Sequence, residues 1–145
     1  MVLSDERRRA LVLAARDARR EAFSPYSGFA VGAAVLTADG RTFGGCNVEV
    51  SSYSHSCCAE RVAVFKAVSE GARQIVACAV VTDTSPPVGP CGACRQVLSD
   101  FGRQTVLLLA NLGDEVREVP LGELLPEAFR PDEVLEHIKK AHREG

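Results

Sequence analysis

The sequence predicts an α/β fold, in which a single domain spanning residues 1–145 holds a mixed five-stranded sheet sandwiched by helices. Its 145 residues match the usual length of one domain. Its 46% hydrophobic content is that of an ordinary globular core. Segments with helical and strand-like hydrophobic patterns follow each other in the order αββαβαββα, which is typical of a sheet covered by helices.

The first half of the chain predicts one helix and a hairpin. Apolar and small residues recur at helical spacing from Ser4 to about Phe23, and Ser4 is a typical N-cap residue. Two strand-like segments follow at residues 31–37 and 42–47. The Asp39-Gly40 turn between them is a strong hairpin signal, so we expect these two strands to be antiparallel.

The second half alternates helices with strands. Helical periodicity over residues 58–70 ends at Gly71. The continuous apolar run at residues 75–81 is typical of a strand that is covered on both faces. A short helix is expected from Cys91 to Leu98. The remaining elements are two strands and a polar terminal helix, at residues 106–110, 116–119 and 131–141.

Composition and charge exclude several classes of protein. Seventeen basic and nineteen acidic residues give a formal net charge of −2, which disfavours binding to nucleic acid or to an anionic membrane. No apolar run approaches the length of about 18 residues that a membrane-spanning helix needs. The charged N-terminal segment differs from a signal peptide, so we expect a cytoplasmic protein. In that reducing compartment, the clustered ones among the six cysteines are expected to be metal ligands or catalytic groups rather than disulfides.

Three of these cysteines lie at the starts of two expected helices. Cys58 opens one helix, and Cys91 and Cys94 open the other with two residues between them. The positive end of a helix dipole lowers the pKa of a thiol and favours the thiolate that binds a metal. The pattern therefore predicts a tetrahedral zinc site with three sulfur ligands and one open position, as in catalytic zinc sites.

Glu60 and a nearby arginine complete this predicted site. Glu60 follows Cys58 by two residues, which is close to the metal but a poor position for a further ligand. We expect it to carry protons as a general acid and base. Three thiolates and one zinc ion sum to a charge of −1, which opposes the loss of a proton from water at the open position. Arg61 or Arg95 can offset this charge by donating to the sulfurs.

Other interpretations of the cysteines stay open at this point. Cys91 and Cys94 alone also match a redox-active pair or half of a structural zinc site. Cys57 or His55 can be imagined as a fourth ligand of such a structural site, although two adjacent cysteines cannot easily bind one ion without strain. The protein would then be a zinc-stabilised module without catalysis.

At these residues the chain resembles the small homotetrameric, zinc-dependent cytidine deaminases of pyrimidine salvage. The resemblance includes the glutamate and the Pro-Cys-x-x-Cys signature of zinc deaminases, and it covers nearly the whole chain. It implies a cytidine deaminase-like fold, a homotetramer and one zinc ion per subunit. The segments that carry it are Ser24–Ser27, Phe29, Val31–Ala34, Gly45–Glu49, Cys58–Arg61, Pro90–Gln96 and Glu123–Pro126.

For the metal side of the site, the resemblance implies one role for each matching residue. Cys58, Cys91 and Cys94 would bind zinc. Glu60 would shuttle protons, and Arg61 would bond to the thiolates and offset their charge. The implied reaction is hydrolytic deamination, in which a zinc-activated water attacks C4 of cytidine or 2′-deoxycytidine and yields uridine or 2′-deoxyuridine.

For the substrate side, the resemblance implies contacts to each part of a nucleoside. Asn47 and Glu49 would hydrogen-bond the ribose hydroxyls, and Phe29 would pack against the pyrimidine. The backbone around Ala59 would contact the cytosine edge. Two further aromatic residues match positions at subunit contacts near a neighbour's site, namely Tyr53 and Phe129.

One departure from the family pattern bears on the substrate. The family usually has Asn after its ribose-binding glutamate, where Val50 stands here. An alternative is a deaminase of the same type that acts on a cytosine nucleoside antibiotic of the blasticidin S class, although Asn47 and Glu49 suit an unmodified ribose. Nucleic-acid editing is disfavoured by the net charge of −2 and by the few aromatic residues. The expected partner is therefore a small nucleoside, with no nucleic acid and no membrane.

Overall fold

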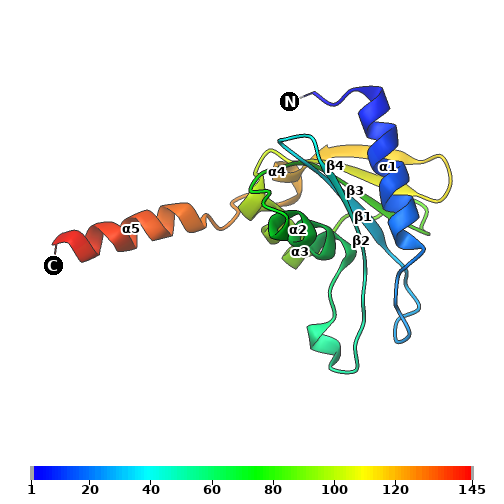
Figure 1. The fold of residues 1–145 in the computed structure, drawn as a ribbon, viewed down its shortest axis with the longest axis horizontal. Helices are drawn as coiled ribbons and strands as arrows, with labels where there is room; N and C mark the ends of the chain where they lie inside the picture. Colours follow the sequence, from blue (N-terminus) through cyan, green and yellow to red (C-terminus); the bar gives the residue numbers. More distant parts are fainter. Residues whose placement is uncertain (1, 145) are drawn as a thin grey trace.

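A five-stranded mixed sheet forms the centre of the structure, a computed structural model that describes residues 2–144. Its strand order is β2-β1-β3-β4-β5 (Figure 1). β3 and β4 are parallel, and every other neighbouring pair is antiparallel. The strands are β1 (Gly32–Thr37), β2 (Thr42–Cys46), β3 (Ile75–Thr82), β4 (Val106–Asn111) and β5 (Val116–Pro120).

Helices cover both faces of this sheet. α1 (Asp5–Arg19) packs on one face, against β1, β2 and β3, whereas α2 (Ala59–Ser69) and α3 (Gly92–Phe101) lie on the opposite face (Figure 1). A 3-10 turn, η1 (Tyr53–His55), lies in the loop before α2, and the short α4 (Leu121–Leu124) follows β5. The predicted fold class, a mixed five-stranded sheet between helices, is therefore confirmed.

The pleat of the strands divides the core into two apolar layers. Successive side chains of a strand point to opposite faces of the sheet. On β3, Cys78 and Val80 face the α2 and α3 layer, whereas Ala77 and Ala79 face α1. Because β3 is buried on both faces, its sequence is a continuous apolar run, as predicted.

Two glycines let helices lie directly on the sheet. A Cβ atom at Gly45 in β2 would lie 2.5 Å from the backbone nitrogen of Ala63 and 2.7 Å from the carbonyl oxygen of Ala59. A Cβ atom at Gly32 in β1 would lie 2.0 Å from the carbonyl oxygen of Ala15 in α1. Both distances are shorter than a real Cβ atom allows. Glycine at these two positions therefore lets α1 and α2 pack this closely on the sheet.

The first helix is shorter than expected. Its amphipathic stripe predicts a helix to about Phe23, but α1 ends at Arg19. Phe23 instead forms a parallel bridge with Val48, in which its N–H donates to the carbonyl oxygen of Asn47 at 2.9 Å. Pairing with a distant segment therefore overrides the local helical preference at the end of this stripe.

The C-terminal helix differs from its expected character. α5 (Pro131–Glu144) extends away from the rest of the protein (Figure 1). Its base is held by an ion pair between Arg103 and Asp132. The sequence predicts a polar helix here, yet α5 exposes the apolar side chains of Val134, Leu135 and Ile138, each at least 42% accessible. Within residues 2–144, no helix combines the length and hydrophobicity required to cross a membrane.

Candidate active site

Three cysteine sulfurs meet where α2 and α3 begin. Cys58 is the N-cap residue of α2, Cys91 is the N-cap residue of α3, and Cys94 lies in the first turn of α3. Their Sγ atoms all lie within 4.8 Å of one another, and those of Cys58 and Cys91 are 3.9 Å apart. The structure thus brings together the three ligands that the sequence analysis expects, from segments that are separate in the chain.

The chemistry and spacing of these sulfurs fit a zinc ion. Zinc binds thiolates at about 2.3 Å, so two sulfurs of a tetrahedral site lie about 3.8 Å apart. The 3.9 Å between Cys58 and Cys91 matches this separation. Three protein ligands are the number found in catalytic zinc sites, where the fourth position receives water or substrate.

The backbone prepares the sulfurs as thiolates. Both N-cap residues are extended, and neither sulfur makes a capping hydrogen bond within the described part of the chain. The positive ends of α2 and α3 therefore act on these sulfurs. The pKa of the Cys58 thiol is lowered to about 5, first by a hydrogen bond with Cys94 and also by one from Arg61. The same shared proton, together with burial, raises the pKa of Cys94.

Glu60 is buried beside this cluster. Its side chain belongs to the first turn of α2, and only 4% of the residue is exposed. The Cys94 thiol donates to Glu60 Oε2 at 3.6 Å. Burial raises the pKa of Glu60, because removal from water disfavours the charged carboxylate. A carboxyl group of this kind can hold a proton and release it within the cavity.

The two candidate arginines have different positions. Arg61 Nη2 donates to Cys58 Sγ at 3.5 Å, which is the contact expected of a group that offsets thiolate charge. Arg95 instead donates to the carbonyl oxygens of Pro90 at 2.7 Å and Leu124 at 2.8 Å. Arg61 therefore acts on the sulfurs, whereas Arg95 holds the loop before α3 against α4.

A cavity of about 440 Å³ opens above the sulfurs. Pockets for small molecules in proteins have volumes of about 300–1,000 Å³, so a nucleoside-sized ligand can be enclosed here. Eight of the residues that the sequence analysis selects line it, namely Phe29, Asn47, Glu49, Tyr53, Cys58, Ala59, Glu60 and Cys91. Cys94 is fully buried beneath the cavity.

Asn47 and Glu49 stand on the segment that leaves β2. The Oδ1 atom of Asn47 accepts from the N–H of Val31 at 2.9 Å, and its Nδ2 donates to the carbonyl oxygen of Phe29 at 2.7 Å. Asn47 therefore holds the backbone on either side of residue 30. One amide hydrogen and one lone pair of its side chain remain for a ligand.

Glu49 is held by the loop that follows α1. Its Oε1 accepts from the N–H groups of Tyr26 at 3.0 Å and Ser27 at 2.9 Å, and its Oε2 accepts from the Ser27 hydroxyl at 2.5 Å. The Ser27 hydroxyl is the main cause of the lowered pKa of Glu49, and the two backbone N–H groups add to it. A carboxylate with these three bonds stays ionised and keeps one free acceptor site on Oε2.

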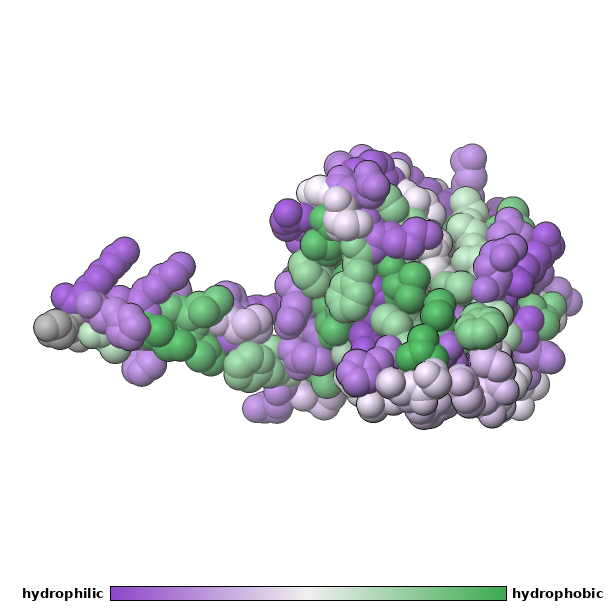
Figure 2. Space-filling model, turned by 60° about the horizontal axis from the view of Figure 1, so that its bottom comes forward, coloured by the Kyte–Doolittle hydropathy of each residue, from purple (hydrophilic) through white to green (hydrophobic). Residues whose placement is uncertain are grey.

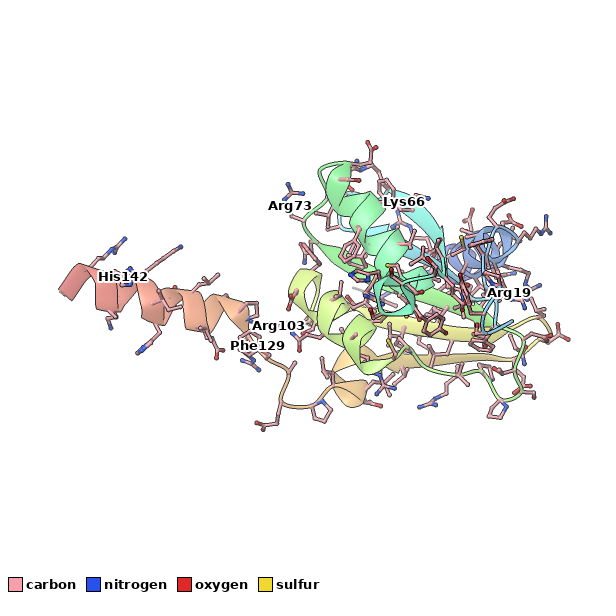
Figure 3. All side chains as sticks on the ribbon, turned by 90° about the horizontal axis from the view of Figure 1, so that it is seen from below. Arg19, Lys66, Arg73, Arg103, Phe129 and His142 are labelled. Carbon is pink, nitrogen blue, oxygen red and sulfur yellow. The ribbon has the colours of Figure 1, made fainter. Side chains whose placement is uncertain are left out.

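The aromatic residues occupy three different places. Phe29 lies in the cavity wall, and Tyr53 reaches the same cavity from η1 with its ring 5.9 Å from that of Tyr26. Phe129 lies outside the cavity, beside Arg103 at the base of α5 (Figure 3). Its carbonyl oxygen accepts from Gln96 Nε2 at 3.1 Å, and its side chain is exposed. The predicted neighbour-subunit roles of Tyr53 and Phe129 remain predictions.

Several cavity residues have no predicted role in catalysis or substrate binding, and Cys57 was considered as a ligand of a structural zinc site. Thr82 could have been found, because it ends β3, and ligands in α/β proteins commonly lie at the carboxyl ends of parallel strands. Cys57 lies in the wall beside Cys58, and burial raises the pKa of its thiol. Ser27 and Val31 belong to segments of the family resemblance but have no predicted role. No local pattern marks the remaining residues, which only the fold brings to the cavity: Ser56, Val80, Val88 and Gly89.

The fold and this site define a class of protein: an α/β zinc protein of the deaminase type. A three-cysteine cluster at two helix N-termini lies below a cavity with a buried glutamate. Residues 5–110 match the family described as the cytidine and deoxycytidylate deaminase zinc-binding region. The chain belongs to this family, and zinc is its cofactor.

Relatives and solved structures agree with this assignment. A cytidine deaminase of Sporosarcina psychrophila is 48% identical over 125 residues, which are 86% of this chain and 92% of that protein. A cytidine deaminase of Mycobacterium tuberculosis is 43% identical over 120 residues, or 83% of this chain and 87% of that one. The crystal structure of cytidine deaminase from Burkholderia pseudomallei matches with a TM-score of 0.81 and 46% identity, over 88% of this chain and 100% of that chain.

Proposed function

We propose that this protein catalyses the hydrolytic deamination of cytidine and 2′-deoxycytidine to uridine and 2′-deoxyuridine in pyrimidine salvage. The observation that carries the proposal is the buried Glu60 carboxyl group, 3.6 Å from one sulfur of a three-cysteine cluster in a cavity of nucleoside size. The relatives named cytidine deaminase support the choice of substrate.

In this proposal Cys58, Cys91 and Cys94 hold the metal, and Glu60 moves the protons. When bound, zinc supplies a Lewis acid that makes a water molecule more acidic. Glu60 accepts a proton from the attacking water and delivers it to N3 of the cytosine ring. It then takes the second proton from the hydroxyl group now bonded to C4 and passes it to the amino group, so that C4 becomes a carbonyl and the C4–N bond breaks to release ammonia. One water is consumed and one ammonia released for each uridine formed.

The substrate side of the proposal uses groups with free hydrogen-bonding capacity. Glu49 Oε2 keeps one acceptor site and the Asn47 amide keeps one hydrogen, so both can bind ribose hydroxyl groups. Phe29 supplies an apolar wall for the pyrimidine. Ala59 is the first residue of α2, so its backbone N–H has no acceptor within the helix. This N–H can donate a hydrogen bond to the cytosine edge.

We further propose that the chain works as a homotetramer in the cytoplasm. The exposed ring of Phe129 lies outside its own cavity, where a second copy can receive it, as the family resemblance implies. All six cysteines lie within the described residues and are free thiols, which suits a reducing compartment. Light scattering of the full chain with two Phe129 variants, Phe129→Leu and Phe129→Ala, tests the tetramer and the contribution of the ring.

The deciding experiment is a substrate panel with the zinc-loaded protein. Loss of the cytidine absorbance band and release of ammonia are followed with cytidine, 2′-deoxycytidine, blasticidin S and single-stranded DNA. We expect turnover of the first two and little of the others. A Glu60→Gln variant that contains a full complement of zinc is the control. Equal turnover by this variant would contradict the mechanism, and faster turnover of blasticidin S would contradict the substrate.

A further inference from the structure

α5 carries an apolar stripe whose largest side chains, those of Val134, Leu135 and Ile138, are exposed in the described part of the chain. Pro131, Val134, Ile138 and Ala141 are spaced by three, four and three residues, which places them on one side of the helix. Leu135 widens this stripe. Figure 2 shows apolar side chains gathered along this helix where it leaves the rest of the protein. A helix with such a stripe is stable in water only when another surface covers it.

The chain is longer than the related structure from Burkholderia pseudomallei. The Burkholderia pseudomallei structure is covered completely by this chain, yet it accounts for only 88% of it. The chain therefore has residues without a counterpart there. α5 is the part of the described chain that stands clear of the sheet and its covering helices (Figure 1).

The stripe is symmetric about position 136. Val134 and Ile138 lie two residues to either side of this position, and Pro131 and Ala141 lie five residues to either side. Two identical helices that cross there in antiparallel directions would therefore place each of these four residues opposite another apolar one. Such self-complementarity is what a two-fold symmetric contact requires.

Two opposite charges beside the stripe are centred about half a residue from position 136. Asp132 and Lys139 are seven residues apart, which is close to two turns, so they lie on one edge of the helix. In an antiparallel pair, Asp132 of each copy faces Lys139 of the other. A parallel pair instead turns this edge toward the other edge of the partner's stripe, so Asp132 and Lys139 do not meet. The helix dipoles also favour the antiparallel arrangement.

We propose that α5 binds α5 of a second copy of this chain as an antiparallel helix pair centred on position 136. Val134, Leu135 and Ile138 of both copies form its apolar seam, and each Asp132 pairs with the other copy's Lys139. The intrachain ion pair between Arg103 and Asp132 fixes the start of the helix while it is presented to the second copy. The pair can form within the proposed tetramer or between assemblies, and it does not depend on the deaminase chemistry.

Carbodiimide crosslinking of the full chain tests this pairing. The reagent joins only a carboxylate and an amine in direct contact, and Asp132 and Lys139 of one helix are about 10 Å apart along its axis. Equal amounts of unlabelled and nitrogen-isotope-labelled protein are mixed, crosslinked and analysed by mass spectrometry. We expect mixed-isotope peptides that join Asp132 of one copy to Lys139 of the other.

Variants on opposite faces of α5 sharpen the test. Ile138→Asp puts a charge into the seam and should reduce these mixed-isotope crosslinks by about tenfold or more. Lys140→Asp adds the same side chain on the opposite face and should leave them unchanged. The charge-exchanged variant Asp132→Lys/Lys139→Glu should keep crosslinks between positions 132 and 139, because an antiparallel pair still places opposite charges together.

Two results would overturn the proposal. One is a full crosslink yield in Ile138→Asp. The other is the absence of 132–139 crosslinks between copies, including the case in which Asp132 links to Lys66 of another copy instead. Neither result bears on deamination, which is measured separately on the same samples by the cytidine assay.

Discussion

Two glutamates line the cavity, Glu60 beside the cysteine cluster (the floor) and Glu49 on the segment after β2 (the rim). Both are buried, at 4% and 5% exposure, yet their pKa values shift in opposite directions. Glu60 on the floor is buried beside three thiols, and burial raises its pKa. Glu49 on the rim accepts three hydrogen bonds, and these lower its pKa. The same side chain is thus prepared to exchange a proton at the floor and to remain an anion at the rim. The predictions below test this division, beginning with the metal below the floor.

Removal of one sulfur should have the largest effect. Cys94→Ser replaces a fully buried thiol of the cluster with a hydroxyl that binds zinc weakly, so zinc content and deamination should both fall to background. Metal analysis and the cytidine assay measure this. Cys78→Ser is the matched control, because Cys78 is equally buried but lies outside the cluster. Full zinc in Cys94→Ser would contradict the assigned ligand set.

Loss of the proton carrier should rank second. Glu60→Gln keeps the shape of the side chain but cannot shuttle a proton, so kcat should fall by about 10²–10⁴-fold. Zinc content and the melting temperature should stay close to those of the parent chain. Steady-state or stopped-flow kinetics measure kcat, and metal analysis measures the zinc content. An equal loss of kcat in Glu49→Gln would contradict the proposal that Glu60 and Glu49 have different roles.

The rim glutamate should instead affect KM and acid stability. In Glu49→Gln the neutral amide binds hydroxyl groups less well, so KM for cytidine should rise by about 10-fold with a smaller change in kcat. The folded pKa of Glu49 is lowered, so its stabilisation is present above its ordinary pKa near 4.5 and is lost as the pH falls through the folded value. Denaturation at a series of pH values should therefore show a flatter acid limb in Glu49→Gln. An unchanged acid limb would show that the loop does not favour the ionised form.

The smallest effect is expected from the group that orients the rim glutamate. Ser27→Ala removes the hydroxyl hydrogen bond to Glu49 and should cost about 1 kcal/mol of stability, with KM raised a few-fold. The pKa of Glu49 should rise towards its ordinary value, which carboxylate-resolved NMR titration measures. Ser69→Ala, whose hydroxyl donates only to a carbonyl oxygen of its own helix, should change neither quantity.

The sequence predicts the floor more completely than the rim, and the reason is physical. The cysteines and Glu60 lie at helix starts, where local spacing and the helix dipole already indicate their chemistry. Asn47 and Glu49 were selected only through the family resemblance. Their positions depend on bridges from Phe23 to Val48 and from Val48 to Cys57, which join three separate segments. No local pattern reveals such bridges.

The same limit explains what the sequence analysis missed. Ser27 appears in the resemblance without a role, because its bond to Glu49 joins residues far apart in the chain. The end of α1 was placed too late for the same reason, since Phe23 is taken by a bridge to Val48. The apolar stripe of α5 was overlooked among its many charges, although its spacing is visible in the sequence. The mixed sheet and its covering helices, by contrast, follow from the alternation of elements.

The close approach at Gly45 makes a residue without a functional group part of the metal site. Any side chain there would lift the start of α2 from β2 and carry Cys58 away from Cys91, whose helix is positioned by other contacts. The separation of the Cys58 and Cys91 sulfurs thus depends on the absence of a side chain at Gly45, on the side of α2 that faces β2. A mutational screen would record Gly45 as a catalytic position, although it touches neither metal nor substrate.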